Sequence, residues 1–225
     1  MPEPIHFPVR QYRDLEEGEY IIIFADPSEG GDFCAAACLS KKYLDYPIIY
    51  SDKIDSAQFG NELYGLAQWI YRQTSIWPHI AVERNTGAAT IHVLRTLNYS
   101  NLFHMVDYAA PNFTPLGQHQ GSVGWLTTGH RTGGEIKGTR RKMLDDLALA
   151  IKQDLLTIYD EEQLKQLISF RYVGDVGRQS GRKHDDHVIT SAGSYEVHLV
   201  TPDVDLYDVP DEEALRNQRA KWRFR

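Results

Sequence analysis

The fold is decided by one stretch of sequence, Tyr20-Ile21-Ile22-Ile23-Phe24-Ala25-Asp26, which is followed at once by Pro27-Ser28-Glu29-Gly30-Gly31-Asp32. Its apolar part is rich in β-branched and aromatic residues, as in a buried strand, and the proline and glycines after it indicate a turn. A strand that ends in a carboxylate holds that acid rigidly, because the sheet fixes the backbone next to it. We therefore expect Asp26 to lie at the mouth of a sheet.

Two other segments repeat this arrangement of an acid at the end of a regular element. Glu83 ends the apolar run Ile80-Ala81-Val82, and the pair Asp185 and Asp186 opens a helix-like stretch. Oxygen ligands from distant segments suit a hard divalent cation such as Mg²⁺ or Mn²⁺. Two such ions about 3.5–4 Å apart can activate water and stabilise the leaving oxygen at a phosphodiester. The acids therefore predict metal-assisted phosphoryl chemistry, with Asp32 as an accessory acid.

Each of these acids also has a simpler interpretation. Asp26 could cap the turn that follows it. Glu83 could pair with Arg84 or cap the helix expected near Thr86, and the aspartate pair could be favourable charge in the first turn of a helix. A metal site is favoured because all three acidic positions coincide with the ends of regular elements. Which of Asp185 and Asp186 would coordinate directly stays open, because consecutive helical residues point about 100° apart.

The composition is that of one α/β domain. The chain has 225 residues, 42% of them hydrophobic, which is enough for one buried core. No apolar run approaches the ~18 residues that a membrane span needs, and no secretory signal is visible at the N-terminus, so a cytosolic location is expected. Cys34 and Cys38 would face the same side of one strand, a poor disulfide geometry, and we expect buried free thiols.

Basic residues gather in two places, although the formal net charge of −7 argues against a protein coated by nucleic acid. The candidate DNA-binding residues are Arg131, Lys137 and Arg140 in the first cluster and Arg178, Arg182, Lys183 and His184 in the second. Either cluster alone could be an ordinary solvated face. Since the second cluster immediately precedes the aspartate pair, contact with phosphate groups is favoured.

The spacing of apolar residues predicts the order of elements in the first half of the chain. Three short antiparallel strands are expected first, over Glu19–Asp26, Asp32–Leu39 and Tyr46–Ser51. They are followed by a helix over Ser56–Gln73 capped by Ser56, a strand over Ile80–Glu83, a helix over Ala88–Leu97 and a strand over Phe103–Val106. Glycines and prolines break any regular pattern between residues 109 and 134, so we expect a long functional loop or hairpin there.

The second half is predicted to be mainly helical. The expected elements are a helix with Leu144, Leu147, Ala148 and Ile151 on one face, a strand over Leu155–Ile158, a helix over Glu161–Ile168, a strand over Phe170–Val173 and the helix that begins near Asp185. This order, with acids on the first strand, on the fourth strand and on the last helix, is that of the ribonuclease H-like fold. We therefore expect an α/β domain with a mixed central sheet, three antiparallel strands and then parallel strands, flanked by helices. Its expected boundaries are 19–200, after an extension over 1–18 and before a tail over 201–225.

Over roughly residues 19–199 the chain resembles the C-terminal nuclease domain of the large terminase subunit of tailed bacteriophages. The motifs that carry the resemblance are Asp26-Pro27-Ser28-Glu29-Gly30-Gly31-Asp32, Val82-Glu83-Arg84-Asn85-Thr86-Gly87, Gly124-Trp125-Leu126-Thr127-Thr128 with Arg131-Thr132, Asp160-Glu161-Glu162-Gln163-Leu164 before Phe170, and His184-Asp185-Asp186-His187. The first and last motifs are moderately specific singly. Their common order and spacing make the resemblance strong.

The resemblance implies a metal-dependent endonuclease that cuts concatemeric viral DNA during genome packaging, in the cytoplasm of an infected bacterium. It implies metal ligation by Asp26, Glu83 and Asp185, with Asp186 and Asp32 as accessory acids. The implied partners are double-stranded DNA and, in a full-length terminase, the packaging ATPase domain, the portal and the small terminase subunit. The chain has no Gly-x-x-x-x-Gly-Lys-Ser/Thr loop, so no ATPase activity is expected of it, and the isolated domain is expected to be a monomer.

Three alternatives remain at this point. A Holliday-junction resolvase or a transposase-type recombinase would share the fold and the acids. A catalytically silent module that binds DNA or the portal would share the fold alone, although no acid of the expected set is missing. Substrate preference and metal-dependent cleavage distinguish these possibilities.

Overall fold

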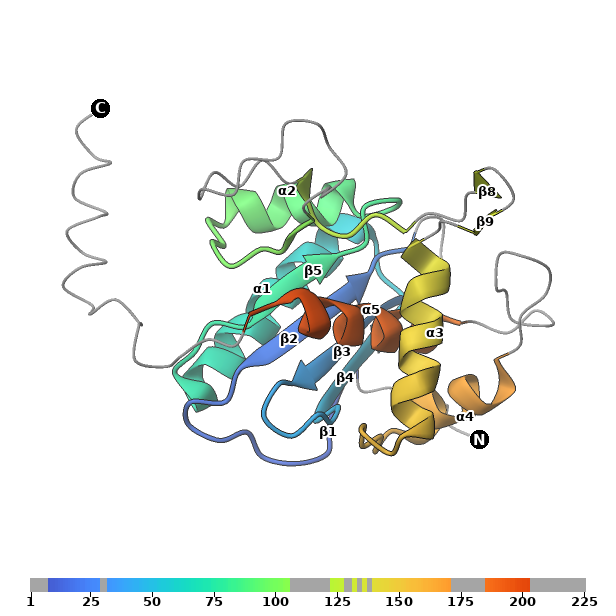
Figure 1. Ribbon diagram of the computed structural model, residues 1–225. Coiled ribbons are helices and arrows are strands. Elements are labelled where there is room, and N and C mark those ends of the chain that lie inside the picture. The colour runs from blue at the N-terminus through green and yellow to red at the C-terminus, as the bar shows by residue number, and fades with distance from the viewer. Residues whose placement is uncertain are drawn as a thin grey trace, which may run out of the picture.

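A five-stranded sheet forms the centre of the computed structural model, with the strand order β1-β4-β3-β2-β5 (Figure 1). The strands are β1 (Val9–Gln11), β2 (Ile21–Asp26), β3 (Cys34–Ser40), β4 (Ile48–Asp52) and β5 (His79–Val82). The structure describes residues 8–28, 32–105, 122–127, 131–132, 135–136, 139–170 and 185–202. The strands β2, β3 and β4 pair antiparallel, and β5 pairs parallel with β2. The mixed sheet predicted from the sequence is confirmed.

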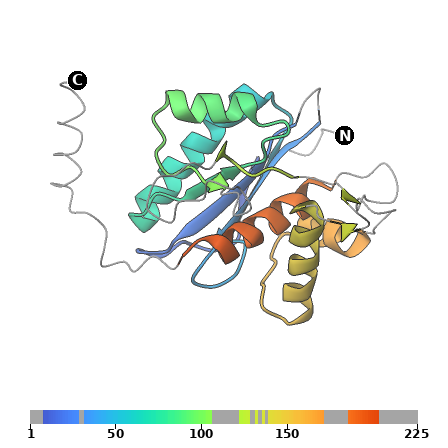
Figure 2. The same cartoon turned by 45° about the horizontal axis from the view of Figure 1, so that its top comes forward.

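Strand β2 lies between two hydrophobic layers, which explains its uninterrupted apolar sequence. Ile23 belongs to the core that α1 (Ser56–Thr74) and α2 (Ala88–Thr96) cover, whereas Ile22 and Phe24 belong to the core under α3 (Thr139–Lys152) and α5 (Asp186–Val200). Figure 2 shows these pairs of helices on opposite sides of the sheet. Helix α4 (Glu161–Ser169) packs beside α5. The fold is therefore a three-layer sandwich of helices, sheet and helices.

Helix α5 can lie close to β2 because Gly193 faces the ring of Phe24. A Cβ atom at Gly193 would come within 2.4 Å of that ring, closer than real Cβ contacts allow. Any side chain at this position would push α5 off the sheet. The glycine thus fixes how near the N-terminal residues of α5 come to the end of β2.

The prediction that Cys34 and Cys38 are buried free thiols is confirmed, and both belong to the same core.

Part of the expected N-terminal extension joins the sheet, because β1 pairs antiparallel with β4. In the described residues, two short antiparallel pairs lie outside the main sheet: β6 (His104–Met105) pairs with β7 (Ser122–Val123), and β8 (Arg131–Thr132) pairs with β9 (Glu135–Ile136). None of the helices in the described part of the chain is long and apolar enough to cross a membrane.

Two sequence-based expectations about helices were wrong in detail. Helix α1 is capped by Asp55 and not by Ser56, because the Asp55 carboxylate accepts hydrogen bonds from the amides of Ala57 and Gln58. The buried face of α3 is formed by Met143, Leu144, Leu147 and Ala150. Ala148 and Ile151 are exposed, since packing against α5 rotates the helix away from the face that apolar spacing alone suggested.

The expected strand over Leu155–Ile158 was also wrong. Only Thr157 pairs there, in an isolated bridge to Asp45. The segment crosses the turn between β3 and β4, where Thr157 exchanges backbone hydrogen bonds with Leu44 and Tyr46. Phe170 is outside any strand, and the rest of the strand expected over Phe170–Val173 lies outside the described residues, as do most of the irregular segment 109–134 and residues 203–225 of the expected tail.

Candidate metal centre

Asp26 and Glu83 lie side by side at the carboxyl ends of two neighbouring parallel strands. The last paired residues are Ala25 and Val82, and the amide of Glu83 donates to the carbonyl of Ala25 at 2.8 Å. Because side chains alternate along a strand, Asp26 shares the face of Phe24 and Glu83 shares the face of Ala81. Both acids therefore face the layer of α5.

The start of α5 brings the aspartate pair to the same place. The pKa of Asp26 is raised well above its ordinary value by burial, then by the charge of Glu83 and a hydrogen bond with that carboxyl, and then by the charges of Asp186 and Asp185. Glu83 is itself buried. The charges of Glu83, Asp185 and Asp186 thus all act on Asp26.

The motif that follows Glu83 holds this side chain in place. The amide group of Asn85 donates to Glu83 Oε1 at 3.3 Å and to the carbonyl of Thr127 at 2.8 Å, and the hydroxyl of Thr86 donates to the carbonyl of Pro27. Helix α2 is not capped by Glu83, since its N-cap is Gly87. A Cβ atom on Gly87 would lie 2.1 Å from the carbonyl oxygen of Glu83, so this turn requires glycine.

Asn85 is a site residue that the sequence did not reveal. Its partner Thr127 lies 42 positions away, on the segment whose residue Trp125 forms a parallel bridge with Glu83. The only sequence signal was its place between Glu83 and the glycine turn.

Arg140 is the predicted DNA-binding residue that the structure brings to the acids. Its Nη2 atom lies 2.7 Å from Oδ2 of Asp185, in an ion pair whose side chains keep 22% and 29% of their surface exposed. Such a partly exposed pair can open, because solvent compensates for the separated charges. Arg140 therefore lies where a phosphate group next to the acids could be bound.

The donor set fits a divalent cation in kind and in charge. All four side chains supply oxygen ligands, and Asp26 lies among acids whose negative charge a cation would offset. Within the described ranges, however, no three acidic, histidine or cysteine side chains converge closely enough to hold one ion. One of the acids, Asp185, is engaged by Arg140. The side chains would have to rearrange on binding a metal ion, with Arg140 giving up Asp185.

The remaining predicted site residues are less informative. Asp32 is exposed and lies two residues before β3, and its backbone carbonyl accepts a hydrogen bond from Ser28. Arg131 lies in β8, without a description of its side chain. The other predicted DNA-binding residues, Lys137, Arg178, Arg182, Lys183 and His184, lie outside the described residues.

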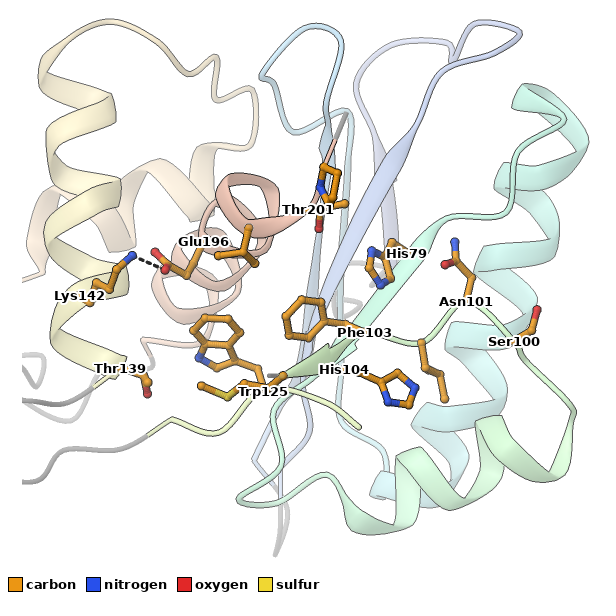
Figure 3. Close-up of a pocket in the computed structure, with 14 residues that line it drawn as sticks. His79, Ser100, Asn101, Phe103, His104, Trp125, Thr139, Lys142, Glu196 and Thr201 are labelled. Atoms are coloured by element: carbon orange, nitrogen blue, oxygen red, sulfur yellow. Dashed lines mark hydrogen bonds and ion pairs between the residues drawn. The ribbon is translucent and has the colours of Figure 1, made fainter. Parts of the chain in front are cut away.

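A cavity of about 630 Å³ lies on the same side of the sheet, beyond Trp125 (Figure 3). It is bordered by Phe103 and by the ion pair of Lys142 and Glu196, and burial lowers the pKa of His79 in its wall to about 4. None of the four acids is among its lining residues in the described part of the chain. The cavity is therefore separate from the acidic cluster, and Trp125 borders both.

Solved structures with the same arrangement of elements are known, although no protein-family model and no curated protein sequence matches the chain. The large terminase nuclease of the thermophilic phage G20c with bound magnesium superposes with a TM-score of 0.62 at 16% identity, over 87% of this chain and 90% of that chain. This chain has the fold of a large terminase nuclease.

Two further terminase nuclease structures agree. The large terminase nuclease domain of Thermus phage P74-26 gives a TM-score of 0.57 at 17% identity, over 84% of this chain and 85% of that one. The G20c nuclease with bound cobalt gives 0.56 at 19% identity, over 87% and 90% of the two chains. At these identities the likeness establishes the ribonuclease H-like fold, and the activity has to be argued from the residues of the site.

Proposed function

We propose that this chain is a divalent-metal-dependent endonuclease that cuts concatemeric viral DNA during genome packaging. The observation that carries the proposal is the meeting of Asp26 and Glu83 at the ends of adjacent parallel strands, opposite the aspartate pair that begins α5. Structures of the G20c terminase nuclease with magnesium, cobalt and zinc support a divalent cation for this fold. Within a terminase the partners would be duplex DNA, the packaging ATPase domain, the portal and the small subunit, in the cytoplasm of the host.

Two Mg²⁺ or Mn²⁺ ions, when bound, would supply an activated water and charge stabilisation at the leaving oxygen. Asp26 and Glu83 would hold the ions together with Asp185 or Asp186. Asn85 keeps the Glu83 carboxylate turned towards the site through its tether to Thr127.

Recruitment of a polyanion to this acidic edge needs local positive charge, because the protein carries a net charge of −7. Arg140 already lies next to Asp185 and can bind a phosphate beside the acids. We propose that Arg131 and Lys137, which precede Arg140 in the sequence, and the basic segment from Arg178 to His184 also contact the DNA.

Cleavage assays on several DNA forms test the proposal. We expect the chain to cut both supercoiled plasmid and linear duplex with Mg²⁺ or Mn²⁺, and to lose this activity in excess EDTA. Cutting in EDTA would contradict the metal assignment. Strong preference for a four-way junction would indicate a resolvase, and DNA binding without cleavage at any metal concentration would indicate a silent binding module.

A further inference from the structure

Among the helices that the structure describes, three begin after an aspartate, and in two of them that aspartate caps its own helix. The Asp55 carboxylate accepts from the amides of Ala57 and Gln58, both at 2.8 Å, at the start of α1. The Asp160 carboxylate accepts from the amide of Gln163 at 2.7 Å at the start of α4. Both aspartates have the extended backbone that this arrangement requires.

Helix α5 departs from this pattern. Asp185 has φ −112° and ψ 16°, and its side chain makes no capping hydrogen bond. Its Oδ2 atom instead accepts from Arg140 at 2.7 Å. The amide of His187, one of those left without a partner at a helix start, donates to Oε1 of Gln166 on α4 at 2.9 Å.

We propose that Gln166 is a positioning residue for the metal centre, because it caps α5 from a neighbouring helix and so keeps the Asp185 carboxylate out of a capping hydrogen bond, beside Arg140, from which a metal ion can take it over. This inference rests on the proposed function. Without an acceptor, the buried amide of His187 would favour a contact with the carboxylate of the N-cap residue Asp185, and the positive end of the helix dipole would add to that preference. Asp185 would then cap its helix as Asp55 and Asp160 do.

The surroundings of Gln166 suit such a role. Gln166 is 8% exposed. The first turn of α4 is anchored by Asp160, whose carboxylate accepts a hydrogen bond from Arg10 Nε at 2.6 Å. One turn before Gln166, the side chain of Gln163 donates to the hydroxyl of Ser191 on α5 at 2.8 Å. A neutral amide also supplies an acceptor without adding another negative charge beside acids that already repel one another.

Metal titrations of matched variants of the full chain test the inference. Free Mn²⁺ would be followed by electron paramagnetic resonance in the wild type, in Gln166→Met, in Gln166→Glu and in Gln163→Met. Gln166→Met should weaken Mn²⁺ binding about tenfold, the lower end of what loss of an outer-sphere partner costs. Gln166→Glu restores an acceptor and should bind at least as tightly as the wild type.

Gln163→Met is the control for simple loss of packing. It removes a buried amide from the same face of α4, so its melting temperature should fall while its Mn²⁺ affinity stays that of the wild type. If Gln166→Met does not fold, Gln166→Asn, whose amide is one methylene too short to reach His187, takes its place with the same expected loss.

The outcomes separate this inference from the proposed function. Equal Mn²⁺ affinity in the wild type and Gln166→Met overturns the role of Gln166 alone. An equal loss in Gln163→Met also overturns it, because the effect would then be structural. A wild type that neither binds Mn²⁺ nor cuts DNA overturns the proposed function, and this inference with it.

Discussion

Glu19 lies just before strand β2 and Asp26 ends it, and these two carboxylates have opposite surroundings. Glu19 accepts from both Nη atoms of Arg13, at 2.5 and 3.1 Å, and from the amide of Glu16 at 2.9 Å. The same guanidinium binds Asp45 through two hydrogen bonds of 2.6 and 2.8 Å. Asp26 has other acids as its charged neighbours.

The protonation of the two acids reflects this difference. Burial alone would raise the pKa of Glu19, but the hydrogen bonds from Arg13 and Glu16 outweigh it and lower this pKa. Burial and neighbouring charge both raise the pKa of Asp26. Ionised Glu19 thus stabilises the fold above its unfolded pKa, and this stabilisation is lost as the pH falls through its lowered pKa. Ionised Asp26 destabilises the fold as the pH rises through the range between its unfolded and its raised folded pKa.

The comparison separates carboxylates that an arginine holds in the fold from an acid that lies among other acids. Glu19, Asp45 and Asp160 each form an ion pair with an arginine. Burial and neighbouring acids raise the pKa of Asp26, an environment typical of sites that bind a cation. Substitutions at these acids and at charged residues elsewhere in the chain test this division.

Asp26→Asn should lower the rate of DNA cleavage with saturating Mg²⁺ by at least about a thousandfold, or about 4 kcal/mol, because a ligand to the metal ions is lost. The melting temperature should stay the same or rise, since one repelling charge is removed. Single-turnover cleavage and thermal unfolding measure the two effects. Cleavage at the wild-type rate would mean that Asp26 is not a ligand.

Glu19→Gln is the matched change at the other end of the strand. It should lower the free energy of unfolding by about 3 kcal/mol, because Arg13 loses a buried charged partner. Below the melting temperature the cleavage rate should be unaffected. Denaturant unfolding of both amide variants gives the comparison directly, and a stability cost at Asp26 equal to that at Glu19 would contradict the division drawn here.

His79→Gln extends the comparison to β5, the strand that begins at His79 and leads to Glu83. It tests whether burial lowers the pKa of His79. Burial, and after it the charge of His104, lower the pKa of His79 to about 4 from a reference of 6.5. The unfolded chain therefore binds the proton more readily, and stability falls as the pH drops from 6.5 towards 4. Between pH 7 and pH 4.5 the wild type should lose about 2 kcal/mol more than His79→Gln, after allowance for solvent.

If the free energy of unfolding changes with pH equally in the wild type and in His79→Gln, then the pKa of His79 is the same in the folded and the unfolded chain. The measurement is the free energy of unfolding in urea at both pH values. Groups that titrate in both proteins contribute equally to both, so their effect cancels in the difference.

Neutralising Arg182 and Lys183 together should make the slope of log DNA affinity against log salt concentration less steep by about 1.8, if each residue contacts one phosphate. Metal affinity should not change. The control is Lys42→Gln with Lys165→Gln, which removes the same charge from residues paired with Glu16 and Glu161. An unchanged slope in the first variant would place the DNA elsewhere, with the segment from Arg131 to Lys142 as the next candidate.

The sequence by itself determined the central elements and the positions of the acids. Apolar runs that end in Asp26 and Glu83 are local patterns, and a strand of this kind needs little information from the rest of the chain. The order of the elements then sufficed for the mixed sheet, which puts the ends of two parallel strands at one edge. The cap of α1 and the strand expected over Leu155–Ile158 were wrong, because short local signals fit more than one structure.

The tertiary structure alone decided which residues hold the acids. Asn85 contacts Thr127 across 42 positions, Arg140 contacts Asp185 across 45, and Gln166 contacts His187 across 21. The same is true of Glu19 and Asp26, both acids at the ends of one apolar run, because Arg13 binds Glu19 whereas Asp26 lies beside Glu83. Such contacts depend on how helices and strands pack, and this packing depends on the whole chain. The spacing of residues along the sequence therefore does not predict them.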